Sequence, residues 1–249
     1  MLYIQQRYKI STKKPYLFIG SKLRGVLGYA LKDEVCINPS FKCEGCFAIS
    51  ECAFYQMYEK QNSTHNYRFN FKLYENKYKF SLLLFGELQK HKDVVSKAMI
   101  SALKEYKDIK FKEKIKELKV KKNVPKKLKI IFETPLRIKK NNRFATRNID
   151  LLDILLSIHR RYLELQNKSY KKIDIDTKYK VEKKLHFEDL VRRSNKQNTK
   201  MNMGGLMGEL IVENISKESY RLLKIGEIIG VGKNCVFGLG KIKVEAIDE

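Results

Sequence analysis

The sequence has no run of 18 apolar residues and no tryptophan, and only 28 acidic residues oppose 52 lysines and arginines. The missing apolar run excludes an ordinary membrane-spanning helix. The first seven residues, Met1–Arg7, lack the basic-then-apolar order of a signal peptide. We therefore expect a cytoplasmic protein, a setting in which cysteines stay reduced.

The shortage of acidic residues leaves a formal net charge of +24 at pH 7. Such an excess favours a polyanionic partner, because phosphate contacts release counterions. RNA, DNA and an anionic membrane surface all fit, but no helix combines a basic face with an aromatic edge, which disfavours the membrane. The segment 104–140 holds 15 Lys and Arg against five acidic residues. It is either a solvated linker or, as we favour, an electrostatic track for RNA.

Glycines are concentrated near the C-terminus, where Gly230–Gly232 and Gly238–Gly240 flank five residues that include Lys233. A glycine-rich loop with a cation inside it suits a phosphate-rich ligand. The spacing fits neither a dinucleotide fingerprint, since Cys235 stands three residues after Gly232, nor a P-loop, since Asn234 follows Lys233. A tightly packed glycine-rich turn is the alternative interpretation.

Hydrophobic periodicity predicts the same order of elements in both halves of the chain. The N-terminal half reads strand, helix from an N-cap at Ser21, insertion, two strands, helix and strand. In the second half, Pro135 interrupts the first strand, which suits an edge or a bulge. The order βαββαβ is the ferredoxin-like, or RRM-like, unit. We predict an α+β protein of two tandem domains, 1–125 and 126–249, with a cysteine-bearing insertion at 35–62.

Four of the five cysteines lie within 17 residues, in the spacing C-x6-C-x2-C-x5-C: Cys36, Cys43, Cys46 and Cys52. Four close thiols suit a tetrahedral metal, with zinc first and an iron–sulfur cluster second. Such a metal would be structural, because four cysteines leave no open coordination position. Four reduced thiols packed in a loop are the alternative.

Several motifs together resemble the CRISPR-associated protein six family, the RAMP-type endoribonucleases that process precursor CRISPR RNA. The doubled glycine triplet resembles the C-terminal loop of that family. Further similar stretches are Leu23–Gly28, Thr134–Ile138, Arg193–Gln197 and Met203–Glu209. The resemblance covers most of the chain and is stronger over 130–249 than over 1–130. It implies the two-domain fold predicted above and RNA as the partner.

The resemblance also implies metal-independent cleavage, in which the ribose 2′-hydroxyl attacks the adjacent phosphate. The products would be a 2′,3′-cyclic phosphate and a 5′-hydroxyl, with no catalytic cofactor. Many members carry the base, commonly a histidine, in or just after the first helix, but none of the four histidines here lies between Ser21 and Glu34. The remaining catalytic candidates are Tyr29, Lys32, His65 and His186. His159 lies on an apolar stripe and is expected in the core, and His91 on the surface.

The expected RNA contacts combine basic clusters with the glycine-rich loop. They are Arg160, Arg161, Arg192, Arg193, Ser194, Lys196, Gly230, Gly232, Lys233, Gly238 and Gly240. The missing helix histidine keeps a second hypothesis open, a non-catalytic crRNA-binding RAMP subunit of an effector complex. A general RNA-binding protein is disfavoured, because the expected RNP1 aromatic pattern is not visible. Other Cas proteins of an effector or adaptation complex are further expected partners.

Overall fold

A computed structural model describes residues 1–13, 19–61, 63–75, 77–106, 108–119, 123–194 and 199–247. The chain divides into two compact units, Met1–Glu117 with Leu165–Asn167, and Leu118–Glu164 with Lys168–Glu249. The boundary predicted between 125 and 126 therefore lies within the second unit. None of the described helices is both long enough and apolar enough to span a membrane.

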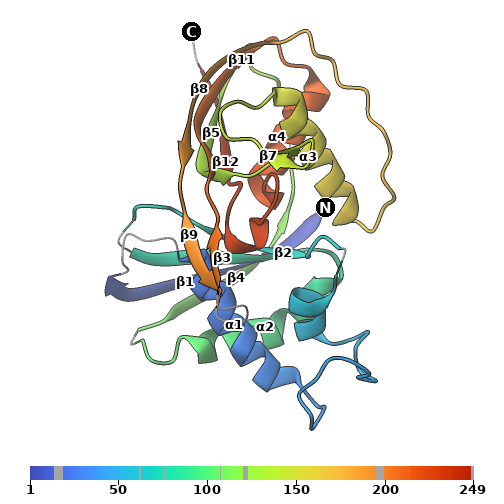
Figure 1. Cartoon of the computed structure of the whole chain (residues 1–249), viewed down its shortest axis with the longest axis vertical. Coiled ribbons are helices and arrows are strands. Elements are labelled where there is room, and N and C mark those ends of the chain that lie inside the picture. The colour runs from blue at the N-terminus through green and yellow to red at the C-terminus, as the bar shows by residue number, and fades with distance from the viewer. Residues whose placement is uncertain are drawn as a thin grey trace. The chain divides into compact units, whose positions relative to one another are not determined.

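The first unit is a four-stranded antiparallel sheet in the order β2-β3-β1-β4, with two helices packed on one face (Figure 1). This strand order is that of the ferredoxin-like unit, as predicted. Its elements are β1 (Leu2–Lys13), α1 (Gly20–Val35), β2 (Tyr67–Phe71), β3 (Lys77–Leu84), α2 (Lys92–Ala102) and β4 (Lys110–Glu117).

Alternation along β1 explains how this sheet divides core from solvent. Ile4, Tyr8 and Ile10 are buried, whereas Arg7 and Lys9 are exposed. Successive side chains of a strand point to opposite faces, so the apolar residues meet the helices. The predicted N-cap is wrong by two positions. α1 begins at Gly20, and its N-cap residue is Ile19, whose side chain makes no capping hydrogen bond. Ser21 lies in the first turn of the helix.

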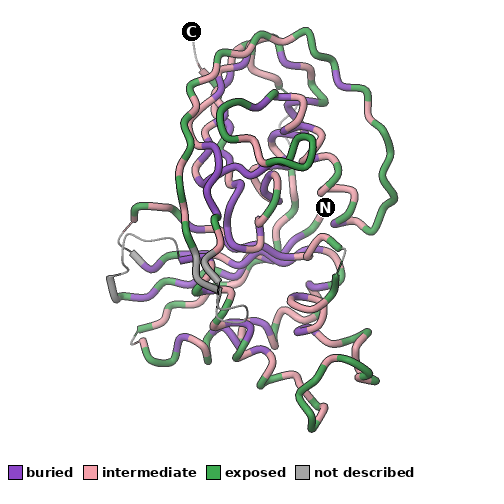
Figure 2. Tube along the Cα trace, in the orientation of Figure 1, coloured by how far each residue is buried: buried purple, intermediate pink, exposed green. Residues whose placement is uncertain are grey.

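The second unit repeats the topology in the order β12-β5-β11-β8, again antiparallel throughout. Its principal elements are β5 (Lys127–Leu136), α3 (Leu151–Glu164), β8 (Lys180–Glu188), β11 (Gly205–Glu213), α4 (Lys217–Ile229) and β12 (Ile242–Ala246). Two short hairpins accompany them, β6 (Lys139–Lys140) with β7 (Arg143–Phe144), and β9 (Val191–Ser194) with β10 (Thr199–Asn202). Figure 2 shows the buried residues concentrated in the sheets and on the inner sides of the helices.

Pro135 lies in a bulge of β5, which is a central strand rather than an edge. Leu206 faces Leu136 while Gly208 faces Phe132, so three residues of β5 are accommodated opposite one residue of β11. A proline fits here because the ladder is already interrupted. The bulge interpretation is thus confirmed and the edge interpretation is wrong.

The cysteine-bearing segment connects α1 to β2 through turns and a short π-helix, η1 (Tyr55–Glu59). Ala53, Phe54 and Met57 anchor its second half in the core of the first unit. Phe47, near its middle, is 83% exposed. The two remaining short helices are the 3-10 turns η2 (Gly86–His91) and η3 (Cys235–Phe237).

The glycine-rich segment after α4 folds back on itself and on the end of β5. Val231 N–H donates to Gly240 O (2.9 Å), and Gly240 N–H donates to Pro135 O (3.0 Å). Gly240 has φ +64°, and a Cβ there would come closer than 3.0 Å to Val231 O, a separation that real Cβ atoms essentially never show. Only glycine therefore permits this backbone approach.

Replacing Gly240 by alanine is expected to lower the free energy of unfolding by about 2 kcal/mol or more, because both the backbone angle and the close carbonyl oppose a side chain. Gly25→Ala is the matched control. Gly25 lies inside α1, and a Cβ there would meet no atom of a neighbouring element within 4 Å. That substitution should raise the free energy of unfolding by about 0.5–1 kcal/mol. Urea-induced unfolding followed by circular dichroism measures both, and equal effects would contradict the argument.

Candidate functional site

Four aromatic rings of the first unit follow one another beside α1, and we call Phe54, Tyr58, Tyr67 and His65 the aromatic row. The Phe54 and Tyr58 rings are stacked, with centroids 5.2 Å apart. Tyr67 lies 6.4 Å from Tyr58, and the His65 imidazole lies 6.1 Å from Tyr67. The row therefore links the π-helix to the residues that precede β2.

Arg24 of α1 is held by this row from two sides. Its guanidinium carbon lies 4.4 Å from the Tyr58 ring centroid, and its Nε donates to the Tyr67 hydroxyl (2.9 Å). The Tyr58 hydroxyl in turn donates to the Arg24 backbone carbonyl (2.7 Å). One helical turn later, a Cβ at Gly28 would lie 2.8 Å from the Tyr58 ring. Gly28 is therefore the residue that allows the ring to reach Arg24.

Two basic side chains belong to this cluster. Burial raises the pKa of Tyr67 and places that of Tyr58 well above the usual range, so both phenols remain neutral. Arg24 is permanently protonated, and Lys32 adds a second cation with its Nζ 5.1 Å from the Phe54 ring centroid. A half-buried imidazole thus lies at one end of a row that carries two cations.

Two of the four predicted catalytic side chains, Lys32 and His65, belong to this cluster. Lys32 contacts Phe54, and His65 packs against Tyr67. Tyr29 is 72% exposed. His186 is an exposed residue of β8 in the second unit, where it faces Met207 across the sheet. Tyr29 and Lys32 stand three residues apart in α1, and their action as a pair stays a prediction.

The α3 helix carries three of the basic and titratable candidates of the second unit. Arg160 is exposed, with its guanidinium carbon 5.6 Å from the Tyr170 ring centroid. Arg161 donates through Nε to Ile229 O (2.9 Å), the last carbonyl of α4. His159 is half-buried rather than in the core, and its Nε2 lies 2.7 Å from Lys171 O. The expectation of a core histidine is wrong because Lys171 offers a polar partner at the surface.

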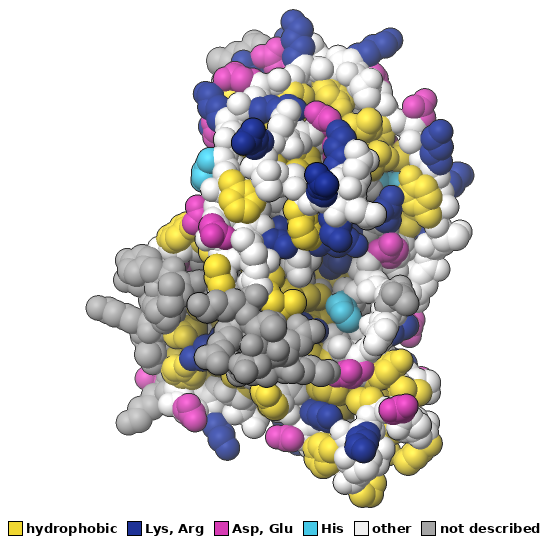
Figure 3. Space-filling view, viewed as in Figure 1, with side chains coloured by type: hydrophobic (Ala, Val, Ile, Leu, Met, Phe, Trp, Pro, Cys, Tyr) yellow, Lys and Arg dark blue, Asp and Glu magenta, His cyan; other side chains and the backbone are white. Residues whose placement is uncertain are grey.

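Basic side chains also gather on the visible face of the second unit over α3 and β7 (Figure 3). Lys139, Lys140 and Arg143 of the β6–β7 hairpin are exposed. Arg192, Arg193 and Ser194 form most of β9, but their side chains lie outside the described part of the structure, as does Lys196. Their role in binding stays a prediction.

The glycine-rich loop is more enclosed than a phosphate-binding loop requires. Gly230, Gly238 and Gly240 are buried, and each donates its N–H to a carbonyl of the protein. Gly232 is half-buried and donates to the Ser157 hydroxyl (3.1 Å). Their N–H groups are thus already engaged, and the glycines serve the close packing of the loop. Contact between these glycines and a ligand stays a prediction.

Lys233 is the exposed cation of this loop, and Arg137 lies directly behind it. The Lys233 N–H donates to Arg137 O (2.7 Å), and the Arg137 guanidinium donates to Asn234 Oδ1 (3.2 Å) and to the Gly204 carbonyl. Its guanidinium carbon also lies 4.2 Å from the Phe144 ring centroid. Arg137 is only 7% exposed, and burial lowers its pKa. This arginine joins the loop, the start of β11 and the β6–β7 hairpin.

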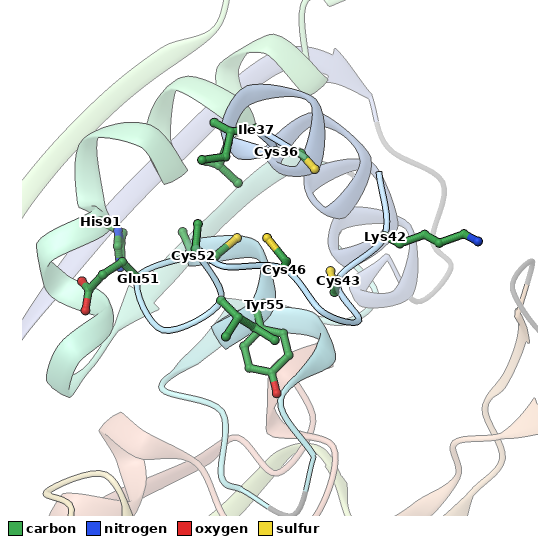
Figure 4. A pocket seen from close by; sticks show the side chains of 13 residues that line it. Cys36, Ile37, Lys42, Cys43, Cys46, Glu51, Cys52, Tyr55 and His91 are labelled. Atoms are coloured by element: carbon green, nitrogen blue, oxygen red, sulfur yellow. The ribbon is translucent and has the colours of Figure 1, made fainter. Parts of the chain in front are cut away.

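The four clustered cysteines line one cavity of about 160 Å³, with their side chains turned toward it (Figure 4). Burial raises the pKa of the Cys43 thiol. His91 also lines this cavity and is half-buried, so it is not the simple surface residue expected. Among the described residues, however, no three His, Cys, Asp or Glu side chains are placed to hold a metal ion. The geometry therefore does not support the predicted structural zinc or iron–sulfur cluster.

Sequence reasoning missed Arg24, Tyr58, Tyr67 and Arg137. Arg24 and Gly28 stand one helical turn apart, which could have indicated a side chain packed across the glycine. Tyr58 and Tyr67 come from the cysteine-bearing segment and the following strand, so no local pattern predicts that they meet. Arg137 follows an apolar strand, and only the fold shows that it is buried.

Comparison with known proteins agrees with this architecture. A family model described as CRISPR-associated endoribonuclease Cas6 matches residues 130–242, and a model described as an N-terminal domain matches residues 6–141. No curated protein sequence matches the chain.

Solved structures match over nearly the full length. A Cas6 product complex is 12% identical, with 98% of this chain and 99% of that chain covered and a TM-score of 0.63. Thermus thermophilus Cas6 is 13% identical over 98% of each chain (TM-score 0.58). A Cas6-related protein from Pyrococcus furiosus is 13% identical over 98% of each chain (TM-score 0.51). The family models extend from residue 6 to residue 242, and the tandem ferredoxin-like fold is that of Cas6 structures. Residues 130–242 therefore match the CRISPR-associated endoribonuclease Cas6 family, and the chain has the fold of Cas6 structures.

Proposed function

We propose that this protein cleaves precursor CRISPR RNA within its repeat, without a catalytic metal. The ribose 2′-oxygen attacks the adjacent phosphorus, and the bond to the 5′-oxygen of the next nucleotide breaks. The 2′-hydroxyl loses its proton and the departing 5′-oxygen gains one, which leaves a 2′,3′-cyclic phosphate and a 5′-hydroxyl. The observation that carries the proposal is the aromatic row, which brings an imidazole and two cations together in a chain with the Cas6 fold.

His65 is our candidate for the proton transfer. An imidazole with an ordinary pKa of about 6.5 exchanges protons readily near neutral pH. His65 follows the cysteine-bearing segment. In our proposal it takes the role of the histidine that many family members carry near α1. Because the ring packs on Tyr67, whose hydroxyl binds Arg24, the row fixes His65 relative to a guanidinium.

Arg24 is our candidate for stabilising the negative charge that develops on the phosphorus oxygens. A guanidinium held from two sides needs little rearrangement when that charge appears, which is the basis of electrostatic catalysis. Lys32 would add positive potential from the other end of the aromatic row. Tyr29, which is exposed, could contact the RNA without contacting Lys32.

RNA binding outside the reacting phosphate is assigned to the exposed cations of the second unit. Lys233 and Arg160 are exposed, and Arg192, Arg193 and Lys196 are further residues that the sequence predicts to bind. A similar structure is described as part of a Cas6–RT–Cas1–Cas2 complex (13% identical, TM-score 0.54, 46% of that chain covered). Association with other Cas proteins is therefore part of the proposal.

Replacing His65 by alanine is expected to slow cleavage by about 10²–10⁴-fold, because general acid–base catalysis contributes that much. The affinity for the repeat RNA should change less than about twofold. The measurement is single-turnover cleavage of the cognate repeat RNA in excess chelator, together with filter binding. His159→Ala serves as the control, since that ring contacts Lys171 O and Tyr170 and lies outside the aromatic row.

A repeat carrying a 2′-deoxy nucleotide at the scissile position should bind and remain intact. Cleavage of this RNA, or loss of all cleavage in chelator, would contradict the mechanism. Binding of the unmodified repeat without any cleavage would favour the alternative, a non-catalytic crRNA-binding subunit.

Arg137 is expected to act on RNA binding through Lys233, because it holds the backbone of Lys233 and the side chain of Asn234. Lys233→Ala should lower the slope of log Kd against log salt by about 0.7–0.9, the loss of one phosphate contact. Arg137→Lys, which cannot reproduce the planar contacts, should weaken binding in the native background. In the Lys233→Ala background its additional effect should be within about 0.5 kcal/mol.

The control for this double-mutant cycle is Arg221→Lys. Arg221 is another arginine of the second unit, and it contacts Glu218 and Tyr162. This substitution should leave the affinity unchanged in both backgrounds. Fully additive effects of the Arg137 and Lys233 substitutions would show that Arg137 acts by another route.

A further inference from the structure

The last strand of the first unit presents a lysine at every second position. β4 reads Lys-Phe-Lys-Glu-Lys-Ile-Lys-Glu from Lys110 to Glu117. Side chains alternate across a strand, so all four lysines lie on one face of the sheet. Phe111, Glu113, Ile115 and Glu117 lie on the opposite face, on which the helices pack.

The neighbouring strands place more cations directly opposite these lysines. Lys112 pairs with Arg7, and Lys110 pairs with Lys9. On its other side, Lys9 pairs with Lys79 of β3. Residues opposite each other in an antiparallel sheet share a face, so these side chains form one surface. We call it the basic stripe: Arg7, Lys9, Lys79, Lys110, Lys112, Lys114 and Lys116.

No acidic side chain balances the basic stripe among the paired residues of this face. The other partners are Tyr3, Gln5 and Ser81. The described ion pairs include no residue of the stripe, whereas Glu113 on the helix face lies 3.1 Å from Lys92. The sheet thus sorts its charges, with carboxylates on one face and cations on the other.

The stripe is open to solvent and internally repulsive. All of its members are exposed except Lys116, which is half-buried. Burial lowers the pKa of Lys116, and the positive charges of Arg7 and Lys114 lower it further. Like charges directly opposite each other destabilise a sheet. A bound polyanion would offset this repulsion between the lysines and arginine of the stripe.

We propose that the basic stripe binds the ribose–phosphate backbone of an RNA strand, as a contact surface additional to the glycine-rich loop. Alternate lysines of a strand recur about every 6.7 Å, which allows one extended strand to be contacted repeatedly. Because ammonium groups contact phosphates without reading bases, binding here should be independent of sequence. The inference rests on the proposed function only in naming RNA as the polyanion.

The test neutralises three lysines of β4 in the full chain, Lys110→Gln, Lys112→Gln and Lys114→Gln together. The probes are the cognate repeat RNA and an oligouridine of about 20 nucleotides, long enough to span the site of a single-strand binder. For both, the slope of log Kd against log salt should fall by about 2, since each phosphate contact of a single strand contributes about 0.7. The midpoint of thermal unfolding should stay the same or rise, because repulsion within the sheet is relieved.

The control removes the same charge from exposed lysines of the same unit that lie outside its strands and outside the segment 104–140, Lys42→Gln, Lys60→Gln and Lys72→Gln. Lys104 is left unchanged, because it belongs to the segment 104–140 predicted to bind RNA, whereas Lys72 lies beyond the end of β2. This triple variant should keep the salt slope of the native protein. An unchanged slope in the β4 variant, or an equal fall in the control, overturns the proposal. So does a fall in thermal stability large enough to explain the loss of binding.

Single-turnover cleavage at saturating repeat RNA separates this inference from the proposed function. The β4 variant should retain the native rate within about twofold. A native protein that binds both RNAs but cleaves neither would refute the proposed enzymatic activity, while the change in salt slope would still decide the role of the stripe.

Discussion

The backbone contact between Gly240 and Val231 is the constraint on which the second unit depends. It brings the segment after α4 against Pro135 and Arg137 at the end of β5, and the adjoining Thr134 hydroxyl accepts the Lys241 N–H (2.8 Å). From this contact β12 can begin beside β5 and complete the sheet. The same fold-back places Lys233 at the surface, with the backbone behind it already hydrogen-bonded. The loop is therefore rigid because its polar groups are satisfied within the protein, and its exposed cation Lys233 is the part available to a ligand.

A comparable arrangement organises the first unit. At Gly28 the absence of a side chain lets the Tyr58 ring approach α1, and Tyr58 and Tyr67 then hold Arg24. In each unit a glycine permits a close approach, and an arginine lies over an aromatic ring. At Arg137, carbonyl, amide and ring contacts leave the positive potential of the guanidinium largely intact. This is the property required of groups that face a phosphate.

The sequence predicted what depends on local periodicity and little of what depends on three-dimensional neighbours. The tandem βαββαβ order followed from alternation in segments such as Tyr67–Phe71, and the family followed from the glycine triplets. The bulge at Pro135 was predictable because proline cannot donate to a ladder. The aromatic row was not, since Arg24, Tyr58 and Tyr67 come from three separate elements. The structural metal is not supported by the geometry of the described residues: four thiols line one cavity, but spacing alone does not determine whether their sulfurs converge.

The glycine pattern also shows how a motif can identify a family for a reason other than its apparent chemistry. Gly230, Gly238 and Gly240 are buried, and their N–H groups donate hydrogen bonds to carbonyls of the protein. The glycines are therefore required by the packing of the loop. The positive charge is distributed differently, over Lys233, the β6–β7 hairpin and the face of β4. Adding or removing a basic side chain at an exposed position alters the packing little. The positions of the cations can therefore be determined by the ligand they bind. For that reason the residues that identify the family and the residues that contact RNA are expected to be largely different sets, and the register of β4 is more informative about binding than the glycines are.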